Sequence, residues 1–283
     1  MAVGVTEFID NTISQDVFSP KIWSKRLIIQ TESMLRFMSA INRVFEKDAK
    51  VGYAILVASI GELAARDKAE NTAITFEALT ETTVTILLNK WKYAAFAIED
   101  LVKVQSHIAL REQYQKKLGY AIGKAQDNDV ADLIPGLSQT VGTLGTPLTD
   151  DNYLRAKRYL DDSDVPEDER VWIISPAEDS NNLKQNRYTS ADYIDSGSPV
   201  ISGKIRKLYG SPILTTTNLN KPAAGQGDNA YFHKEALAAV VQEEPQTSAF
   251  YDMRYMTWLI AVSTIYGVKE MRDQFGVWMK GAA

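Results

Sequence analysis

Two histidines, His107 and His233, are the first candidates for chemistry in this sequence. A metal site or a catalytic triad needs further ligands at fixed spacing on the same or a matching element. Neither histidine has a second His, Asp or Glu at such a spacing, so both are interpreted as structural or surface residues. The chain has no cysteine, which excludes disulfides, thiolate metal sites and cysteine nucleophiles.

The glycine-bearing stretch from Gly197 to Lys204 resembles a phosphate-binding loop at first sight. Five residues separate its glycines where the motif requires four, and Ile205 stands where Ser or Thr would bind magnesium. The G-x-S-x-G motif, which presents a nucleophilic serine on a sharp turn, does not occur. The stretch is therefore interpreted as a turn, and no cofactor is expected.

Three acidic clusters could bind calcium or act as paired acids and bases: 150–151, 161–164 and 167–169. The EF-hand pattern fails, because Val165-Pro166 follows the Asp162-x-Asp164 pair. Acid–base work needs a cleft that shifts the pKa of a carboxyl group, and neighbouring residues on an exposed turn offer none. We therefore predict a solvated turn at 164–170 with its charges in water, leading into a buried strand at 171–174.

Composition limits the function further. The 283 residues are 45% hydrophobic and carry a net charge of −5, which predicts a sizeable core and no basic surface for coating nucleic acid. The N-terminus lacks the basic and apolar regions of a signal peptide. No apolar run reaches the roughly 20 residues that span a bilayer, so a soluble protein with no membrane contact is expected.

The elements of the first half are unusual for a self-contained domain. A weakly patterned arm leads into a helix at 22–41, and three strand-like runs follow at 53–60, 82–88 and 92–98. They predict a long hairpin over 51–98 with its tip near Glu62 to Thr75. An isolated two-stranded hairpin is only marginally stable, so this one needs another surface to lie on.

A long helix is predicted at 104–127, where apolar residues recur at steps of three and four. Beyond a loop at 133–147, the pattern predicts a helix at 150–161, the strand at 171–174, and polar loops at 178–199 and 215–229. The C-terminal part is rich in strand signals, at 237–241, 256–267 and 275–279. The whole pattern indicates an α+β fold.

The order of these parts resembles the major capsid proteins of tailed bacteriophages, which have the Hong Kong 97-type fold. The resemblance rests on several segments. KIWSKRLIIQ follows the arm, SIGELAARDKAENTAITFEALTETTVTILLNKWKYAAFAIEDL resembles the extended loop, and REQYQKKLGYAIGKAQD resembles the spine helix. VPEDERVWIISPAE is similar to the family's turn-and-strand unit, and WLIAVSTIYGVKEMRDQFGVWMKG to its closing strands. Together they extend over nearly the whole chain.

The resemblance implies a division of the chain. Residues 1–47 would form an N-terminal arm and leading helix, and 48–98 the extended β-hairpin loop. Residues 99–133 and 231–283 would form a peripheral domain with the spine helix at 104–127, and 134–230 an axial domain. The subunit contacts would include residues of the arm and the loop tip: Phe18, Trp23, Arg66, Asp67, Lys68 and Glu70.

The resemblance also implies the function and the partners. The chain would not be an enzyme but a shell subunit that self-assembles, as pentamers and hexamers, into the icosahedral head around double-stranded DNA. DNA would be contacted weakly, and a separate scaffolding protein and a portal are expected. Whether a decoration protein also binds stays open. The protein would assemble in the host cytoplasm and remain in the virion.

Two alternatives stay open at this stage. An encapsulin-like compartment would share the fold and package an enzyme, and a hydrolase with dispersed carboxylates would need a deep pocket. Some relatives crosslink a lysine of the loop to a neighbouring asparagine. Lys68 lies near the predicted tip, but no partner for it can be identified, so no crosslink is expected.

Overall fold

The computed structural model describes residues 35–60, 65–74, 76, 81–99, 110–189 and 205–282. The helices and 3₁₀ turns among them are α1 (Phe37–Ala40), η1 (Val44–Asp48), α3 (Leu110–Ala131), η2 (Ile134–Gly136), α4 (Asp150–Asp162), α5 (Pro176–Lys184), α6 (Asn186–Thr189), η3 (Lys234–Ala236) and η4 (Asp273–Phe275). The strands are β1 (Ala54–Ile60), β2 (Glu81–Leu87), β3 (Lys90–Glu99), β4 (Gln139–Gly142), β5 (Arg170–Ile174), β6 (Lys207–Leu208), β7 (Ser211–Thr215), β8 (Gln226–His233), β9 (Leu237–Asp252), β10 (Thr257–Glu270) and β11 (Gly276–Ala282). This mixture confirms the α+β class.

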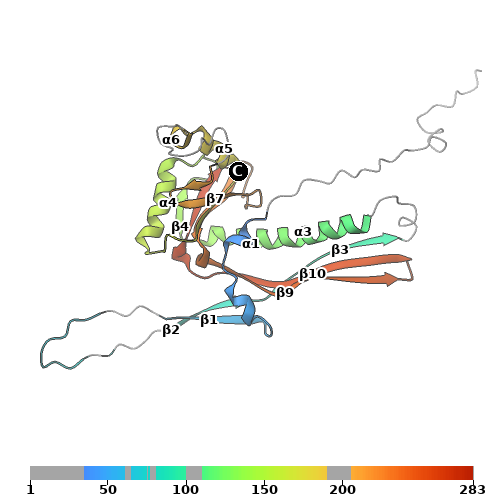
Figure 1. Ribbon diagram of the computed structural model, residues 1–283, viewed down its shortest axis with the longest axis horizontal. Helices are drawn as coiled ribbons and strands as arrows, with labels where there is room; N and C mark the ends of the chain where they lie inside the picture. The colour runs from blue at the N-terminus through green and yellow to red at the C-terminus, as the bar shows by residue number, and fades with distance from the viewer. Residues whose placement is uncertain are drawn as a thin grey trace, which may run out of the picture.

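Three sheets organise the described part of the chain. A hairpin of β1 and β2 projects from the body, and the sheet β3-β10-β9 extends in the opposite direction alongside α3 (Figure 1). The six-stranded sheet, in the order β4-β11-β8-β5-β7-β6, forms the body with α4, α5 and α6. Only this last sheet has a large core of its own on both faces.

The core of the six-stranded sheet is built around large aromatic side chains. Trp172 of β5 is fully buried and stacks on Tyr231 of β8, with ring centroids 3.6 Å apart. The Trp172 indole also donates a hydrogen bond to the carbonyl of Leu208, at 3.0 Å. The α4 helix covers this face, while Phe37 and the C-terminal end of α3 cover the other. The arrangement leaves both projections outside the main core.

The predicted hairpin is too long at its C-terminal end. The structure pairs β1 with β2 from Ala54↔Leu87 to Ile60↔Glu81, whereas β3 pairs with β10, more than 150 residues further along the chain. The chain leaves the hairpin at Leu88, whose amide donates to the carbonyl of Tyr53 at 2.8 Å. The sequence pattern places strand 92–98 in the hairpin because the nearest strand-like runs in the chain lie there, whereas the true partner is distant in sequence.

Several other predictions differ from the structure. Most of the helix predicted at 22–41 lies outside the described residues, and within 35–41 only the short helix α1 forms. The described α3 begins at Leu110 and extends four residues beyond the predicted end. Residues 176–184 form α5 rather than a loop. Strand β11, grouped in prediction with the other C-terminal strands, joins the six-stranded sheet between β4 and β8.

Candidate subunit interface

The tip of the β1–β2 hairpin lies far from the body and has no core. Arg66, Asp67, Lys68 and Glu70, which sequence reasoning singled out, are all exposed in the segment 65–74. The tip turns at Asn71, whose φ of 61° is left-handed, a conformation that asparagine tolerates well. The hydrogen bond that the hydroxyl of Thr72 donates to the carbonyl of Ala69 fixes the turn, at 2.7 Å. The four charged side chains are thus presented together at the end of a projection.

The hairpin is anchored only at its root. Ile86 and Leu88 are buried there in a small cluster with Ala49, Ala238 and Val240. Further out, apolar side chains face solvent, and Phe76 is 92% exposed. A surface of this kind, on an element without its own core, is typical of a segment that another molecule covers.

The three-stranded sheet has one covered face and one bare face. Inward side chains of β3 and β10, such as Phe96 and Ile260, pack against Leu118 and Ile122 of α3. On the opposite face Trp91 and Tyr93 are 73% and 76% exposed. At the end of the β9–β10 hairpin a further group of large apolar residues is exposed: Phe250, Met253, Tyr255 and Met256.

Sequence reasoning missed these apolar residues as a surface. Strand β3 alternates lysine and aromatic residues, and the ordinary expectation is that aromatic residues point into the core. The structure has the reverse, since Lys90 and Lys92 face α3 and bind Asp129 there. No local signal in the sequence distinguishes the two orientations, because Asp129 is distant in the chain.

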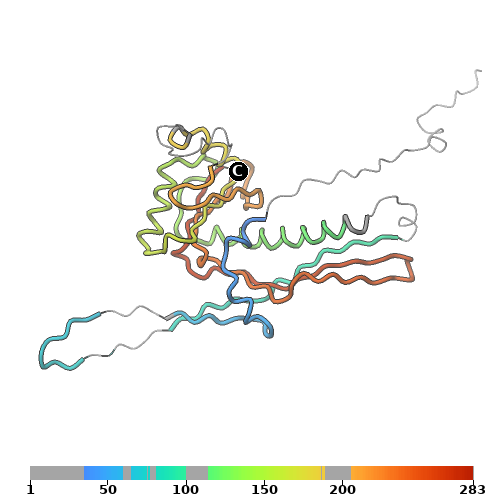
Figure 2. The backbone as a smooth tube through the Cα atoms, in the orientation of Figure 1, coloured from blue at the N-terminus to red at the C-terminus, as the bar shows by residue number. Residues whose placement is uncertain are grey.

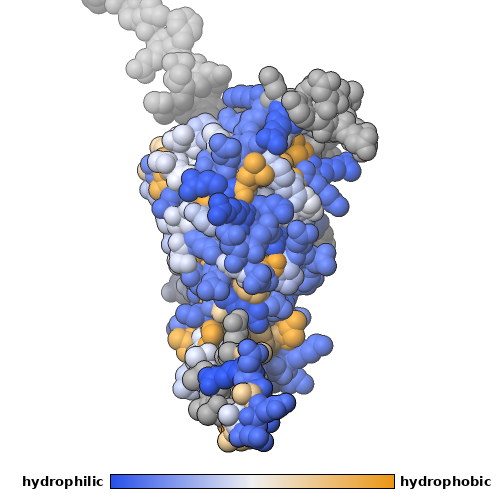
Figure 3. All heavy atoms as spheres, turned by 90° about the vertical axis from the view of Figure 1, so that its left-hand side faces the viewer, coloured by the Kyte–Doolittle hydropathy of each residue, from blue (hydrophilic) through white to orange (hydrophobic). Residues whose placement is uncertain are grey.

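The end of the molecule that carries α4 is different in character. Figure 3 views the molecule from the side on which α4 and the hairpin lie in Figure 1. Over the body, hydrophilic residues cover most of this face, and apolar residues occur singly. The extended apolar surfaces therefore belong to the projections rather than to this face of the six-stranded sheet.

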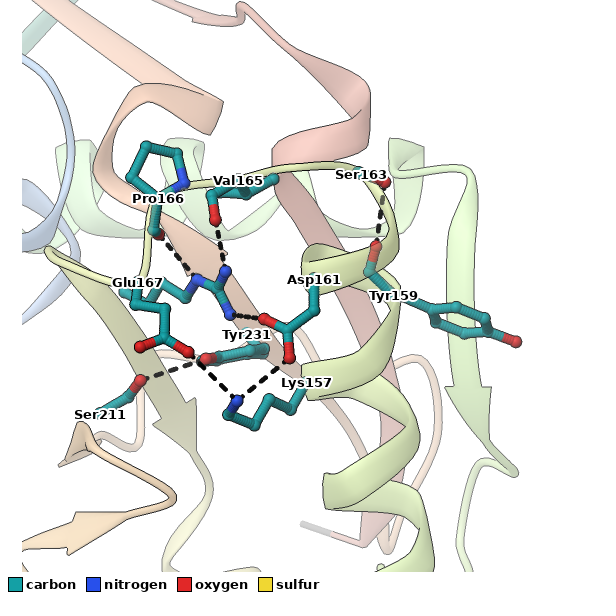
Figure 4. Close-up of polar contacts among 10 residues, drawn as sticks. Lys157, Tyr159, Asp161, Ser163, Val165, Pro166, Glu167, Ser211 and Tyr231 are labelled. Atoms are coloured by element: carbon teal, nitrogen blue, oxygen red, sulfur yellow. Dashed lines mark hydrogen bonds and ion pairs between the residues drawn. The ribbon is translucent and has the colours of Figure 1, made fainter.

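The acidic turn at 164–170 is not a catalytic cleft. Glu167, Asp168 and Glu169 are exposed, as predicted. Arg170 is not: its side chain is 2% exposed, which corrects the prediction that the charges of this segment face water. The carbonyls of Val165 and Pro166 and the carboxylate of Asp161 converge on its guanidinium (Figure 4). Five N–H donors in a fixed fork make arginine able to hold such a turn from within.

His233 has a structural environment. Its side chain is buried, and Nδ1 accepts a hydrogen bond from the amide of Glu235 at 3.2 Å. Burial lowers its pKa, so the neutral form that this hydrogen bond requires is favoured. His107 lies outside the described residues. Within the part of the chain that the structure describes, no group of three or more His, Asp or Glu side chains could hold a metal ion.

No helix in the described ranges has the length and apolar character needed to cross a membrane. The predicted contact residues of the arm, Phe18 and Trp23, lie outside the described residues. The structure thus brings Arg66, Asp67, Lys68 and Glu70 together at one tip, with apolar surfaces on the hairpin and on the three-stranded sheet. These features define a subunit built to be covered by other protein.

Comparison with known proteins gives the family. Residues 39–277 match the family described as phage capsid protein, and the chain belongs to this family. No curated protein matches it. The chain is a major capsid protein, the subunit that forms the head shell of a bacteriophage, and its place is the capsid of the virion. Capsid proteins are a family of structural proteins and not of enzymes, which disfavours the hydrolase, and the match to a phage capsid family favours the phage shell over an encapsulin-like compartment.

Solved structures agree on the fold. A chain from Mycobacterium phage Che8 is similar over 93% of this chain and 97% of its own, with 25% identity and a TM-score of 0.81. A capsid chain of the cyanophage P-SCSP1u is similar over 94% of this chain and 93% of its own, with 16% identity and a TM-score of 0.77. A chain of the mature capsid of bacteriophage PhiM1 is similar over 95% of this chain and 94% of its own, with 13% identity and a TM-score of 0.74. The predicted Hong Kong 97-like fold is confirmed.

Proposed function

We propose that copies of this chain assemble as pentamers and hexamers into an icosahedral shell around double-stranded DNA, with the arm and the hairpin lying across neighbouring copies. In this arrangement residues 48–98 include the extended loop, 99–133 with 231–283 the peripheral domain, and 134–230 most of the axial domain. Strand β11 lies within 231–283 but pairs with β4 and β8, so we assign this strand to the axial domain instead. Assembly takes place in the host cytoplasm.

The β1–β2 hairpin carries the proposal. It projects away from the body, its tip is charged and exposed, and its apolar side chains beyond the root have no core to enter. Neighbouring copies would supply the missing surface, and a closed shell multiplies many weak contacts of this kind. Arg66, Asp67, Lys68 and Glu70 would make polar contacts with neighbours, and the arm would make apolar contacts through Phe18 and Trp23.

The charge of the chain supports a container rather than a DNA-binding protein. A net charge of −5 gives little of the counterion release that drives tight binding to nucleic acid. The packaged DNA would be held by the shell as a whole, without sequence recognition. The scaffolding protein and the portal stay predictions, as does the absence of a crosslink at Lys68.

Replacing residues 65–74 by an equally long Gly-Ser segment tests the role of the hairpin. We expect a folded subunit with unchanged thermal unfolding, because the tip contributes nothing to the core, and loss of closed shells in negative-stain microscopy. A matched control replaces the exposed loop 221–224 by Gly-Ser residues and should leave assembly intact. Normal shells from the tip variant would contradict the proposal.

A further inference from the structure

The C-terminal end of α3 carries an unfavourable set of charges. Asp127 and Asp129 lie in its last turns, Asp132 follows its last residue, and no basic residue occupies the last turn. Carboxylates are destabilising at this end of a helix, where the peptide dipoles place partial negative charge. Asp132 is exposed, but Asp127 and Asp129 are buried. The two buried aspartates therefore need compensating contacts from elsewhere in the fold.

Asp127 binds the main chain where the N-terminal arm meets the body. Its side chain is fully buried, and its two carboxylate oxygens accept hydrogen bonds from the amides of Arg36, at 3.0 Å, and Met38, at 3.2 Å. The side-chain amide of Asn218 donates a third, at 3.4 Å. Three hydrogen bonds thus converge on one buried carboxyl group, so Asp127 holds residues 36–38 firmly.

A second contact joins the same segment to α3. Leu35 packs so closely against Gly123 that a side-chain carbon there would lie 2.6 Å from the leucine Cδ1. Phe37 of this segment and Ile41 just after it enter the main core. The amide of Asn42 donates to the carbonyl of Leu237. Figure 2 shows this segment running from α3 to the base of the hairpin.

Asp129 performs the corresponding role for the hairpin. Its carboxylate lies 3.2 Å from Nζ of Lys90 and 3.7 Å from Nζ of Lys92, and the hydroxyl of Tyr266 donates to it at 2.5 Å. Lys90 is the first residue of β3, directly after the chain leaves the hairpin at Leu88. One carboxylate thus joins α3, the strand that follows the hairpin and the central strand β10.

The hairpin root has little freedom to shift against β10. A side-chain carbon at Gly267 would lie only 2.2 Å from the carbonyl oxygen of Leu87, so the end of β2 crosses β10 at a point where only glycine fits. Gly267 lies next to Tyr266, whose hydroxyl binds Asp129, so the hairpin root and Asp129 contact adjacent residues of β10. The last turns of α3 thus contact both residues 36–38 and the start of β3, the strand that follows the hairpin.

From these contacts we propose that Asp127 and Asp129 are positioning residues that fix the directions of the arm and the hairpin from the C-terminal end of α3. The proposal rests on the proposed function, since the directions matter only if both projections reach neighbouring copies. It adds that the two projections share one anchor, so that assembly depends on the geometry of this helix end as well as on the contacting residues themselves.

The test uses three isosteric substitutions in the full chain. Asp127→Asn replaces one acceptor oxygen by an NH₂ group, which cannot accept the hydrogen bond from the amide of Arg36 or Met38. Asp129→Asn removes the negative charge that attracts Lys90 and Lys92. Asp132→Asn is the matched control, because it relieves the same unfavourable helix-end charge on an exposed side chain. Amide hydrogen exchange of the unassembled subunit is measured first, and then the rate of shell assembly by light scattering.

We expect local effects in the unassembled subunit. In Asp127→Asn, hydrogen exchange at the amides of Arg36 and Met38 should become about tenfold faster or more. In Asp129→Asn, exchange at the amides of residues 88–92 should rise in the same way. Both variants should assemble more slowly, while Asp132→Asn stays like the natural chain. Combining Asp129→Asn with the Gly-Ser replacement of 65–74 should slow assembly no further than the replacement alone.

Three results would overturn the inference: unchanged exchange at these amides, unchanged assembly in both variants, or an equal effect of Asp132→Asn. If Asp127→Asn yields too little folded protein, Leu35→Ala removes the second contact of the same segment and should raise the same exchange. Failure of the proposed function is a separate result, recognised when the tip replacement itself leaves assembly normal.

Discussion

At the scale of residues, Arg170 shows how a charged side chain can organise a turn from inside. It reaches the carboxylate of Asp161 at 2.6 Å and two main-chain carbonyls, while the neighbouring acidic residues point to solvent. Lys157 adds ion pairs to Asp161 at 3.0 Å and to Glu167 at 3.5 Å. Two left-handed residues, Asp164 and Glu169, bracket the turn, and this strain is tolerated because the guanidinium contacts fix the chain between them.

This turn predicts an acid-sensitive contribution to stability. Burial alone would raise the pKa of Asp161, but hydrogen bonds and charges from Arg170 and Lys157 outweigh it and hold the pKa below its ordinary value. Such a carboxylate stabilises the fold above its unfolded-state pKa of about 3.9, and the contribution is lost as pH falls through the lower folded-state pKa.

Asp161→Asn should therefore cost about 2 kcal/mol at pH 7, allowing for partial solvent screening of Asp161. The difference from the natural chain should shrink below about pH 4, measured by thermal unfolding of the unassembled subunit. Asp162→Asn is the control, since its ion pair with Arg158 is exposed on both sides and should change stability by less than about 0.5 kcal/mol. A pH-independent difference for Asp161→Asn would contradict this account.

At the scale of elements, α5 shows how a polar segment becomes a helix. Ser175 is its N-cap, with an oxygen that accepts from the amide of Glu178 at 3.1 Å, and Pro176 suits the first turn. The Ser175 hydroxyl also donates to the carbonyl of Ala282 at 2.7 Å. The carboxylate of buried Glu178 accepts from the amides of Leu148 and Ala282, so the helix start holds the end of β11.

Ser175→Ala should destabilise the subunit by about 1–2 kcal/mol, because it removes both the cap and the contact with β11. Urea unfolding of the unassembled subunit measures the effect. Ser180→Ala in the same helix is the control. It removes only an exposed hydrogen bond to the carbonyl of Pro176, and alanine favours the helix interior, so the loss of stability should be smaller. Equal losses of stability in the two variants would contradict a stabilising role of the Ser175 cap.

At the scale of the whole molecule, the described chain is one well-filled core with two poorly covered extensions. The bare face of the three-stranded sheet presents Trp91 and Tyr93, whose exposure exceeds that of ordinary isolated apolar residues. In a shell this face would be covered by another copy. The single subunit is then stable but incomplete, and its exposed apolar area serves assembly rather than folding.

The double substitution Trp91→Thr with Tyr93→Thr tests this division, because threonine keeps the strand preference and removes the apolar area. The free energy of unfolding of the subunit should change by less than about 1 kcal/mol, since both side chains are largely exposed. Assembly into shells should be strongly reduced in sedimentation. Glu99→Thr, at an exposed position of the same strand, is the control. Normal shells with the double substitution would refute a role for this face.

The sequence by itself determined the elements whose signals are local. The acidic first turn of α4, the buried strand β5 and the exposed charged tip at 66–70 follow from neighbouring residues, and so does the order of parts that indicates the family. Such features depend on helix capping, hydrophobic periodicity and turn chemistry, which involve only residues that are close together in the sequence.

Only the tertiary structure decided which strands pair and which side chains face outward. Strand β3 leaves the hairpin to pair with β10, and β11 crosses to the other sheet, because strand pairing is decided by partners far apart in the chain. Asp129 turns Lys90 and Lys92 inward and leaves Trp91 on the surface. An alternating strand fits a core on either face, and the deciding partner here is a carboxylate almost 40 residues away.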